Sequence, residues 1–379
     1  MDTHAPLRIA VIGAGAISQS VHLTSLRRAG FELTWVCDVS PTRAAAIAAA
    51  SGARPATDPA EVFAAPDVDA VLLATPGSHA QLAAQALRAG KHVLAEKPLA
   101  FTVREVDELV ELAASTGLTA QVGYMKMFDP LTQTAAAELA DLHGIRLVRV
   151  TVSHPADDPQ IAHLRLPEPP ADADPGVIAA AVDYDRARAA EALPGADDAV
   201  LDYYMNVLNG SVIHEFSLLR AVGLSLPAQW DASVVTPLEG PEPASLLATA
   251  TVDGTVFQLS WNWLPEYPEY DEELAVFGAN GRLEFHLAKP YLLEERSRLI
   301  SRRHDAELRR DTTYTAGHDT GFLRQLDAFA EAIGNRTTNQ ASFAGAALDI
   351  AALQEVARGI AAARGLSVVP ETQATKDRA

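Results

Sequence analysis

The spacing of apolar residues divides the chain into two parts. Between residues 7 and 125, short apolar runs alternate with stretches of helical periodicity. The runs predict buried strands at 7–12, 33–37, 53–56, 70–74, 92–95 and 119–122. The stretches between them predict helices. Because each helix returns the chain across the sheet, this alternation predicts a doubly wound parallel α/β sheet over residues 1–125.

Beyond residue 126 the apolar period changes to two. Residues 145–152 alternate and predict the first strand of a second sheet. Four further strands are predicted, at 246–252, 256–263, 273–278 and 282–287. Helices are predicted at 212–222, 321–333 and 342–363. We therefore expect a second, α+β domain over residues 126–369 and a frayed tail at 370–379.

Residues 155–200 form a proline- and aspartate-rich insert in the second domain. They hold seven of the 23 prolines, which exclude a central strand. One helix is expected in the insert, at 177–192, lying over the cleft. Long ordered segments of this kind are usually functional. The candidate substrate contacts here are the side chains of His154, Asp157, Asp158 and His163, and a solvated loop is the alternative. Their irregular spacing has no metal-ligand pattern, so we expect no metal.

Composition narrows the classes of partner. The chain has 379 residues, 48% of them hydrophobic, and a formal net charge of −19. This charge argues against nucleic acid and anionic membranes as partners, since both would repel it. A single cysteine, Cys37, excludes an internal disulfide and fits a reducing cytoplasm. No apolar run approaches the ~20 residues that cross a bilayer, and no basic leader begins the chain.

The first strand leads into a glycine turn of the dinucleotide-binding kind. Gly13 and Gly15 permit a tight turn and a close approach to a pyrophosphate, whose charge the following helix N-terminus favours. Ser18 stands where a third glycine is usual. Asp38 ends the second strand, where a carboxylate binds the adenosine ribose and repels a 2′-phosphate. This favours NAD over NADP, although the nearby Arg43 is a residue type that binds such a phosphate.

Glu96, Lys97 and Pro98 end the strand at 92–95 abruptly. Proline cannot continue the ladder, so the two charged residues lie at the carboxyl end of a strand. Open α/β sheets bind their ligands at this edge. Beside Glu96 and a cofactor, the pKa of Lys97 could be shifted into a range useful for proton transfer. The alternative is a surface ion pair at a strand end.

In these features the chain resembles the Gfo/Idh/MocA family of nicotinamide-dependent oxidoreductases, named for glucose–fructose oxidoreductase and inositol dehydrogenase. The resemblance rests on the segments 12–15, 21–23, 74–76, 95–98, 123–124 and 128–130. Its most specific part is Glu96-Lys97-Pro98. It implies an N-terminal Rossmann domain followed by an α+β domain with a large, open, mostly antiparallel sheet. One face of that sheet would cover nicotinamide and substrate, and the other often forms an oligomer interface.

The resemblance also implies which residues bind the cofactor. Four backbone N–H groups would hold the pyrophosphate, those of Gly13, Gly15, Ala16 and Ile17. The adenosine ribose would be bound by Asp38 and the nicotinamide ribose by Glu96. The cofactor crevice would be lined by Thr75, Pro76 and His79. His22 occupies a position common in the family, but a lone histidine on a helix is expected to be structural.

Two residues would handle the proton of the reacting hydroxyl, Lys97 and His214. The family has an aspartate four residues before this histidine, and the chain has Gly210 there. An aspartate one turn away would orient the imidazole or stabilise its protonated form. Three interpretations stay open: another group replaces the aspartate, Lys97 carries most of the proton transfer, or no redox step is catalysed. The replacements considered are Tyr203, Tyr204, Asn206, Asn209 and Glu215.

We therefore expect an NAD(H)-dependent dehydrogenase or reductase acting on a CH–OH group of a sugar, aminosugar or cyclitol. It would form a homo-oligomer, a dimer or tetramer, through the open sheet. Further substrate contacts are expected from Tyr124, Lys126, His154, His163, Asn206 and Asn209. Two alternatives stay open: a glycosidase or epimerase that retains NAD and uses transient oxidation, and a non-catalytic regulator that senses a dinucleotide.

Overall fold

The computed structural model describes residues 6–156, 160–168, 170–234, 238–240, 242–304 and 307–371. Asp157 and Asp158, which the sequence marks as substrate contacts, lie outside these residues, as does most of the expected tail. The described residues fall into two compact units. The first contains residues up to Met125 together with Leu164–Arg188 and Phe322–Ala347. The second contains Lys126–His163, Ala189–Gly321 and the chain from Leu348.

The first unit is built on a parallel sheet of six strands in the order β3-β2-β1-β4-β5-β6. The strands are β1 (Arg8–Ile12), β2 (Glu32–Cys37), β3 (Arg54–Ala56), β4 (Ala70–Leu73), β5 (His92–Ala95) and β6 (Ala120–Val122). The intervening helices are η1 (Ser18–His22), α1 (Leu23–Arg28), α2 (Pro41–Ser51), α3 (Pro59–Ala64), α4 (Ala80–Arg88) and α5 (Val103–Thr116). All four residues of β4 are buried, as expected of a strand covered on both faces. The doubly wound fold is confirmed.

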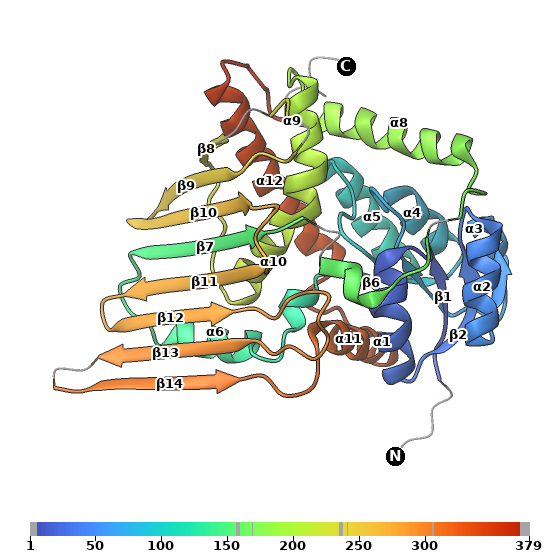
Figure 1. Cartoon of the computed structure of the whole chain (residues 1–379), viewed down its shortest axis with the longest axis horizontal. Helices are drawn as coiled ribbons and strands as arrows, with labels where there is room; N and C mark the ends of the chain where they lie inside the picture. The colour runs from blue at the N-terminus through green and yellow to red at the C-terminus, as the bar shows by residue number, and fades with distance from the viewer. Residues whose placement is uncertain are drawn as a thin grey trace. The chain divides into compact units, whose positions relative to one another are not determined.

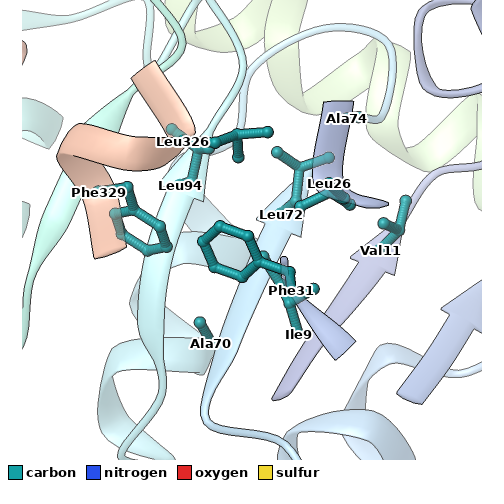
Figure 2. Packing of buried hydrophobic residues seen from close by; sticks show 10 residues of the cluster. All are labelled: Ile9, Val11, Leu26, Phe31, Ala70, Leu72, Ala74, Leu94, Leu326 and Phe329. Atoms are coloured by element: carbon teal, nitrogen blue, oxygen red, sulfur yellow. The ribbon is translucent and has the colours of Figure 1, made fainter. Parts of the chain in front are cut away.

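A cluster of apolar side chains packs one face of this sheet (Figure 2). Ile9, Leu72 and Leu94 point from three neighbouring strands toward Phe31, and Leu326 and Phe329 close the cluster from helix α11 (Gly321–Asn335). Each fully buried side chain of this size contributes roughly 1.5–3 kcal/mol. Helix α11 therefore belongs to the first unit, although it follows the strands of the second in sequence.

The second unit is built on eight strands in the order β14-β13-β12-β11-β7-β10-β9-β8, drawn side by side in Figure 1. They are β7 (Leu147–His154), β8 (Asp231–Val234), β9 (Leu246–Val252), β10 (Thr255–Trp263), β11 (Asp271–Gly278), β12 (Gly281–His286), β13 (Arg298–His304) and β14 (Arg309–Thr315). Only the β7–β10 pair is parallel among these strands. The expected large, mostly antiparallel sheet is confirmed.

Burial alternates along these strands. In β7, Val148, Val150 and Val152 are buried and the residues between them are half-buried. Helix α10 (Ile213–Ala221) packs on the buried face, since Phe216 stacks on Trp230, whose ring meets Phe257 of β10 edge-on. The other helices of the unit include α6 (Thr132–Ala140), α9 (Asp198–Tyr203) and most of α12 (Phe343–Ala363).

Three strands and several helical segments, among them α6, α9 and η4, are absent from the prediction. Strands β13 and β14 carry arginines on both faces, which hides the alternation that marks a strand. Such charged strands suit the edge of a sheet, where they discourage pairing with other chains. Strand β8 has only four residues. The predicted helix at 212–222 continues a longer helical run, because the π-helix η4 (Tyr204–Val212) leads directly into α10.

Candidate functional site

The glycine turn follows β1, and its two glycines have different roles. Gly13 has φ +93°, and a Cβ there would lie 2.6 Å from the Ala74 carbonyl oxygen, so the turn presses against the end of β4. A Cβ on Gly15 would meet no described heavy atom within 4 Å. Gly13 is therefore needed for backbone packing, whereas Gly15 leaves open space beside the turn.

Ser18 closes the turn from the helix side. Its buried hydroxyl donates to the Gly13 carbonyl at 2.6 Å, and Gln19 Nε2 donates to the Ala14 carbonyl at 2.8 Å. The serine that replaces the third glycine thus ties the start of η1 to the turn.

Asp38 faces the turn from the end of β2. One carboxylate oxygen accepts the Ala14 N–H at 2.8 Å and the other accepts the Ser40 N–H at 2.9 Å. Arg43 Nη1 lies 3.4 Å from both oxygens. The backbone N–H groups use one acceptor position on each oxygen, and the long Arg43 contacts use the second, where the hydroxyls of a ribose could replace them.

Glu96 is held in place by His22. His22 Nε2 donates to Glu96 Oε1 at 2.8 Å, and the Lys97 N–H donates to the other oxygen at 3.2 Å. Burial alone would raise the pKa of Glu96, but the hydrogen bond from His22 and the charges around it hold that pKa below its usual value. Glu96 is therefore a carboxylate at neutral pH. A Cβ on Gly123 would lie 2.9 Å from Oε1, so only glycine fits beside it.

His79 lies at the start of α4, after the turn that contains Thr75 and Pro76. Its Nδ1 donates to the Pro98 carbonyl at 2.9 Å. Burial lowers the pKa of the imidazole, so the ring is neutral and Nε2 is an acceptor. That atom is buried and has no hydrogen-bond partner among the described residues. Thr75 is half-buried and Pro76 is exposed.

Lys97 follows β5 directly and is half-buried. The bond between Lys97 and Pro98 is cis. In the first unit, the turn after β1, Asp38 after β2, Thr75 after β4 and Glu96-Lys97 after β5 all lie at the carboxyl ends of adjacent parallel strands. These residues fit a dinucleotide: an open turn, a carboxylate at the end of β2, and a buried imidazole acceptor that has no hydrogen-bond partner in the described part of the chain.

His214 lies in the second unit, in the first turn of α10, and is buried. A Cβ on Gly210 would have Met205 O, at 4.0 Å, as its nearest neighbour, so a side chain fits there. Asn209 is buried and donates to the Tyr204 carbonyl at 3.0 Å, and the Tyr203 hydroxyl donates to the Ala244 carbonyl at 2.8 Å. These bonds use polar groups considered as replacements for the aspartate. Asn206 is exposed.

Lys126 lies in a buried acidic cluster that sequence reasoning missed. Its ammonium donates to Glu215 at 2.7 Å and also binds Glu272, which in turn accepts from the Tyr270 hydroxyl at 2.8 Å. Burial alone would lower the pKa of Lys126, but the two carboxylates hold it above its usual value. Burial raises the pKa of Glu215 to about 7. The partners come from α10 and β11, so no spacing in the sequence signals them.

The two predicted histidine contacts of the second unit have different surroundings. The His154 ring lies 5.3 Å from the Trp261 ring, 5.6 Å from Trp263 and 5.5 Å from Tyr270. Its Nδ1 donates to the Pro155 carbonyl at 2.7 Å. His163 is exposed on the short helix η3 (Ala162–Leu164). Tyr124, in the first unit, is fully buried.

Within the described ranges, no group of three or more His, Cys, Asp or Glu side chains is arranged to hold a metal ion. No helix in the described part of the chain is long and apolar enough to span a membrane.

Comparison with known proteins centres on the first unit. Residues 7–124 match the family described as "Oxidoreductase family, NAD-binding Rossmann fold". Inositol 2-dehydrogenase of Mycolicibacterium smegmatis is 44% identical over 128 residues, 33% of this chain and 37% of that protein. The 4-carboxy-2-hydroxymuconate-6-semialdehyde dehydrogenase of Sphingobium sp. is 38% identical over 130 residues, 34% of this chain and 41% of that protein. The matches thus span less than half of either relative.

A solved structure matches most of the chain. It is a 3-ketoreductase from Actinomadura kijaniata in complex with TDP-benzene and NADP, which is 20% identical with a TM-score of 0.68. The match covers 94% of this chain and 98% of that one. At this identity the likeness shows a shared fold for both units.

Proposed function

We propose that this chain is an NAD(H)-dependent dehydrogenase or reductase of the Gfo/Idh/MocA oxidoreductase family, whose NAD-binding Rossmann domain residues 7–124 match. It would move hydride between the nicotinamide and a secondary alcohol or ketone of a sugar, aminosugar or cyclitol. One observation carries the proposal. The open glycine turn, Asp38 and the Glu96-Lys97 pair share the carboxyl edge of one parallel sheet, where such sheets bind ligands.

In this proposal, the first unit holds the cofactor. The N–H groups of Gly13, Gly15, Ala16 and Ile17 bind the pyrophosphate, and the open space at Gly15 admits it. Asp38 binds the adenosine ribose, whose hydroxyls replace the long contacts from Arg43. Glu96, oriented by His22, binds the nicotinamide ribose, and the turn residues Thr75, Pro76 and His79 line the site. When bound, the nicotinamide takes hydride from the carbinol carbon or returns it.

Lys97 is the proposed proton carrier at this sheet edge. In oxidation the alcohol loses its C–H hydrogen as hydride and its O–H proton to a base, and Lys97 Nζ would take that proton. In reduction Lys97 would return it to the new hydroxyl. His214 is proposed as the second group that handles the proton, without the family's aspartate at Gly210.

The proposal also covers the substrate class, the oligomeric state and the cellular location. The names of relatives support a cyclitol or sugar as substrate. Tyr124, His154, His163, Asn206 and Asn209 remain proposed contacts, whereas the ammonium of Lys126 is engaged by two buried carboxylates. We also propose a cytoplasmic homo-oligomer that associates through the less buried face of the eight-stranded sheet. Cys37 is buried, and burial raises the pKa of its thiol to about 12, so the thiol is unreactive.

One observation favours a second candidate. Two carboxylates of the insert, Asp172 and Asp185, bond to the turns after β2 and β4. A segment anchored over this edge would slow the release of a dinucleotide. An enzyme that retains NAD and uses transient oxidation to cleave or epimerise a sugar is therefore the alternative.

Substitution of Lys97 tests the main proposal. Lys97→Ala should abolish turnover and leave the dissociation constant for NADH within about threefold of the wild type, because the lysine acts on the substrate hydroxyl. Lys97→Arg keeps the charge but cannot release a proton at working pH, so it should also be inactive. Lys289→Ala, far from the turn residues in sequence and half-exposed, is the control. Wild-type turnover by Lys97→Ala would refute the assignment.

A further inference from the structure

The proline- and aspartate-rich insert is bonded to the turn that follows β2. Asp172 Oδ1 accepts the Ser40 hydroxyl at 2.5 Å, and Oδ2 accepts the Thr42 N–H at 3.0 Å. Both oxygens of the carboxylate thus accept hydrogen bonds from residues that lie 130 or more positions earlier in the chain. All of these residues belong to the first unit.

The turn is the start of helix α2. Ser40 is its N-cap, because its hydroxyl accepts the Arg43 N–H at 3.1 Å. The Thr42 N–H is one of the first-turn donors that lack a partner within a helix. A carboxylate here is favoured by that donor and by the helix dipole. The same hydrogen bonds hold the pKa of Asp172 low, at about 2, so the group is an anion throughout the neutral range.

Without Asp172, this turn would be a site for a second anion. The Ser40 hydroxyl and the Thr42 N–H would then be open to another anion, with Arg43 next along the chain, and these are donor types that bind phosphate. The site lies beside Asp38, whose oxygen accepts the Ser40 N–H at 2.9 Å. Asp38 is the proposed partner of the adenosine ribose, so the added phosphate of NADP, on the 2′-oxygen, would fall among these donors.

We propose that Asp172 determines cofactor specificity: it occupies the Ser40 and Thr42 donors that a 2′-phosphate needs and so selects NAD against NADP. The inference rests on the proposed dinucleotide site. Asp38 alone does not fully exclude NADP, and the insert supplies the rest of the discrimination. The negative charge of Asp38 disfavours the phosphate, but the positive charge of Arg43 would offset it. Asp172 occupies the remaining donors and adds a second negative charge.

A second pair of contacts keeps the insert seated when Asp172 is changed. Asp185, in helix α8 (Pro175–Ala192), accepts the Ser78 N–H at 3.1 Å and the Ser78 hydroxyl at 2.8 Å. The neighbouring Tyr184 hydroxyl donates to Glu105 at 2.5 Å. Removal of the Asp172 carboxylate therefore leaves two anchors of the same helix intact.

The test is titration of NADH and NADPH into the wild type and variants, followed by nicotinamide fluorescence. The wild type should bind NADH at least about tenfold more tightly than NADPH. Asp172→Ala should reduce that ratio by about tenfold or more, the value of one charge-assisted hydrogen bond, by tightening NADPH alone. Asp172→Asn, which removes the charge but keeps an acceptor, should have a smaller effect. Asp183→Asn, exposed on α8, is the control and should match the wild type.

Two outcomes would overturn the inference alone: wild-type protein that binds both nucleotides equally, or an Asp172→Ala ratio equal to that of the wild type. Failure of the wild type to bind either nucleotide would refute the proposed function and this inference with it. Circular dichroism and thermal melts of each variant establish that a changed ratio comes from folded protein.

Discussion

His22 Nε2 lies 2.8 Å from Glu96 Oε1, although 74 residues separate them in the chain. His22 ends the helical turn η1 that follows the glycine turn, and Glu96 follows β5. The bond therefore ties the proposed pyrophosphate site to the proposed nicotinamide end of the same sheet edge. His22, expected to be structural, also meets Phe322 edge-on at 5.9 Å. From the hydrogen bond we propose that His22 also positions Glu96.

His22→Ala should raise the KM for NAD by about tenfold and change kcat less, because Glu96 would lose its orientation but remain present. The free energy of unfolding should fall by about 1–3 kcal/mol, the cost of leaving a buried carboxylate without this donor. His22→Gln, which keeps a donor at similar reach, should restore much of both. Steady-state kinetics and urea denaturation measure these effects. His143→Gln, at an exposed histidine, is the control, and an unchanged KM in His22→Ala would contradict the role.

The two turn glycines should respond differently to the same substitution. Gly13→Ala forces a Cβ to 2.6 Å from the Ala74 carbonyl oxygen at φ +93°, so it should lower the free energy of unfolding by about 1–3 kcal/mol and weaken NADH binding. Gly15→Ala meets no neighbour within 4 Å, so it should leave stability near wild type and weaken only NADH binding. Thermal melts and NADH titrations separate the two. Equal stability loss in both variants would show that the open space at Gly15 is not what the structure indicates.

Gly210→Asp should restore the aspartate that the family carries. The position has room, with Met205 O at 4.0 Å as the nearest neighbour of the new Cβ. A carboxylate one turn before His214 should favour the protonated imidazole, because the charges are opposite. If His214 accepts a proton in oxidation, the acidic limb of the pH profile of kcat/KM moves to higher pH. Gly210→Asn, with the same shape and no charge, should not move it; identical profiles for the two variants would exclude His214 from the titration.

The acidic cluster around Lys126 should make stability depend on pH. Burial raises the pKa of Glu215 from 4.5 to about 7. The folded state therefore holds a proton that the unfolded chain releases, so this group makes the free energy of unfolding fall as pH rises from about 4.5 to 7. Above that window its contribution is constant. Glu215→Gln should flatten the melting temperature across the window. Glu111→Gln, exposed on α5, should keep the wild-type slope, and a wild-type slope in Glu215→Gln would assign the effect elsewhere.

The fold was predictable from the sequence where the residues of a single segment indicate its structure. The apolar runs of β1, β4 and β5 and the turn at Gly13 predict the parallel sheet, because burial on both faces requires continuous apolar residues. Strands β13 and β14 gave no such signal, since their arginines point to both faces. Nothing in the amphipathic pattern of α11 says which sheet it will cover.

Contacts between distant segments were not predictable from the sequence. The pairs His22–Glu96 and Asp172–Ser40 join segments whose separation follows from chain topology and not from periodicity. Lys126 carries one charge at a position that offers no hint of its two buried carboxylates. The sequence could therefore indicate the residues of the glycine turn and the strand-end lysine, but not the residues that orient or cover them.

The most direct test of the central proposal is the absorbance of reduced nicotinamide. Purified protein would be incubated with NAD or NADP and a panel of sugars, inositols and aminosugars, and with the reduced cofactors and the matching ketones. We expect a change in absorbance with NAD and at least one polyol, and no change with Lys97→Ala. No change with any substrate in either direction, from protein that binds NAD tightly, would contradict a net dehydrogenase and favour a retained cofactor.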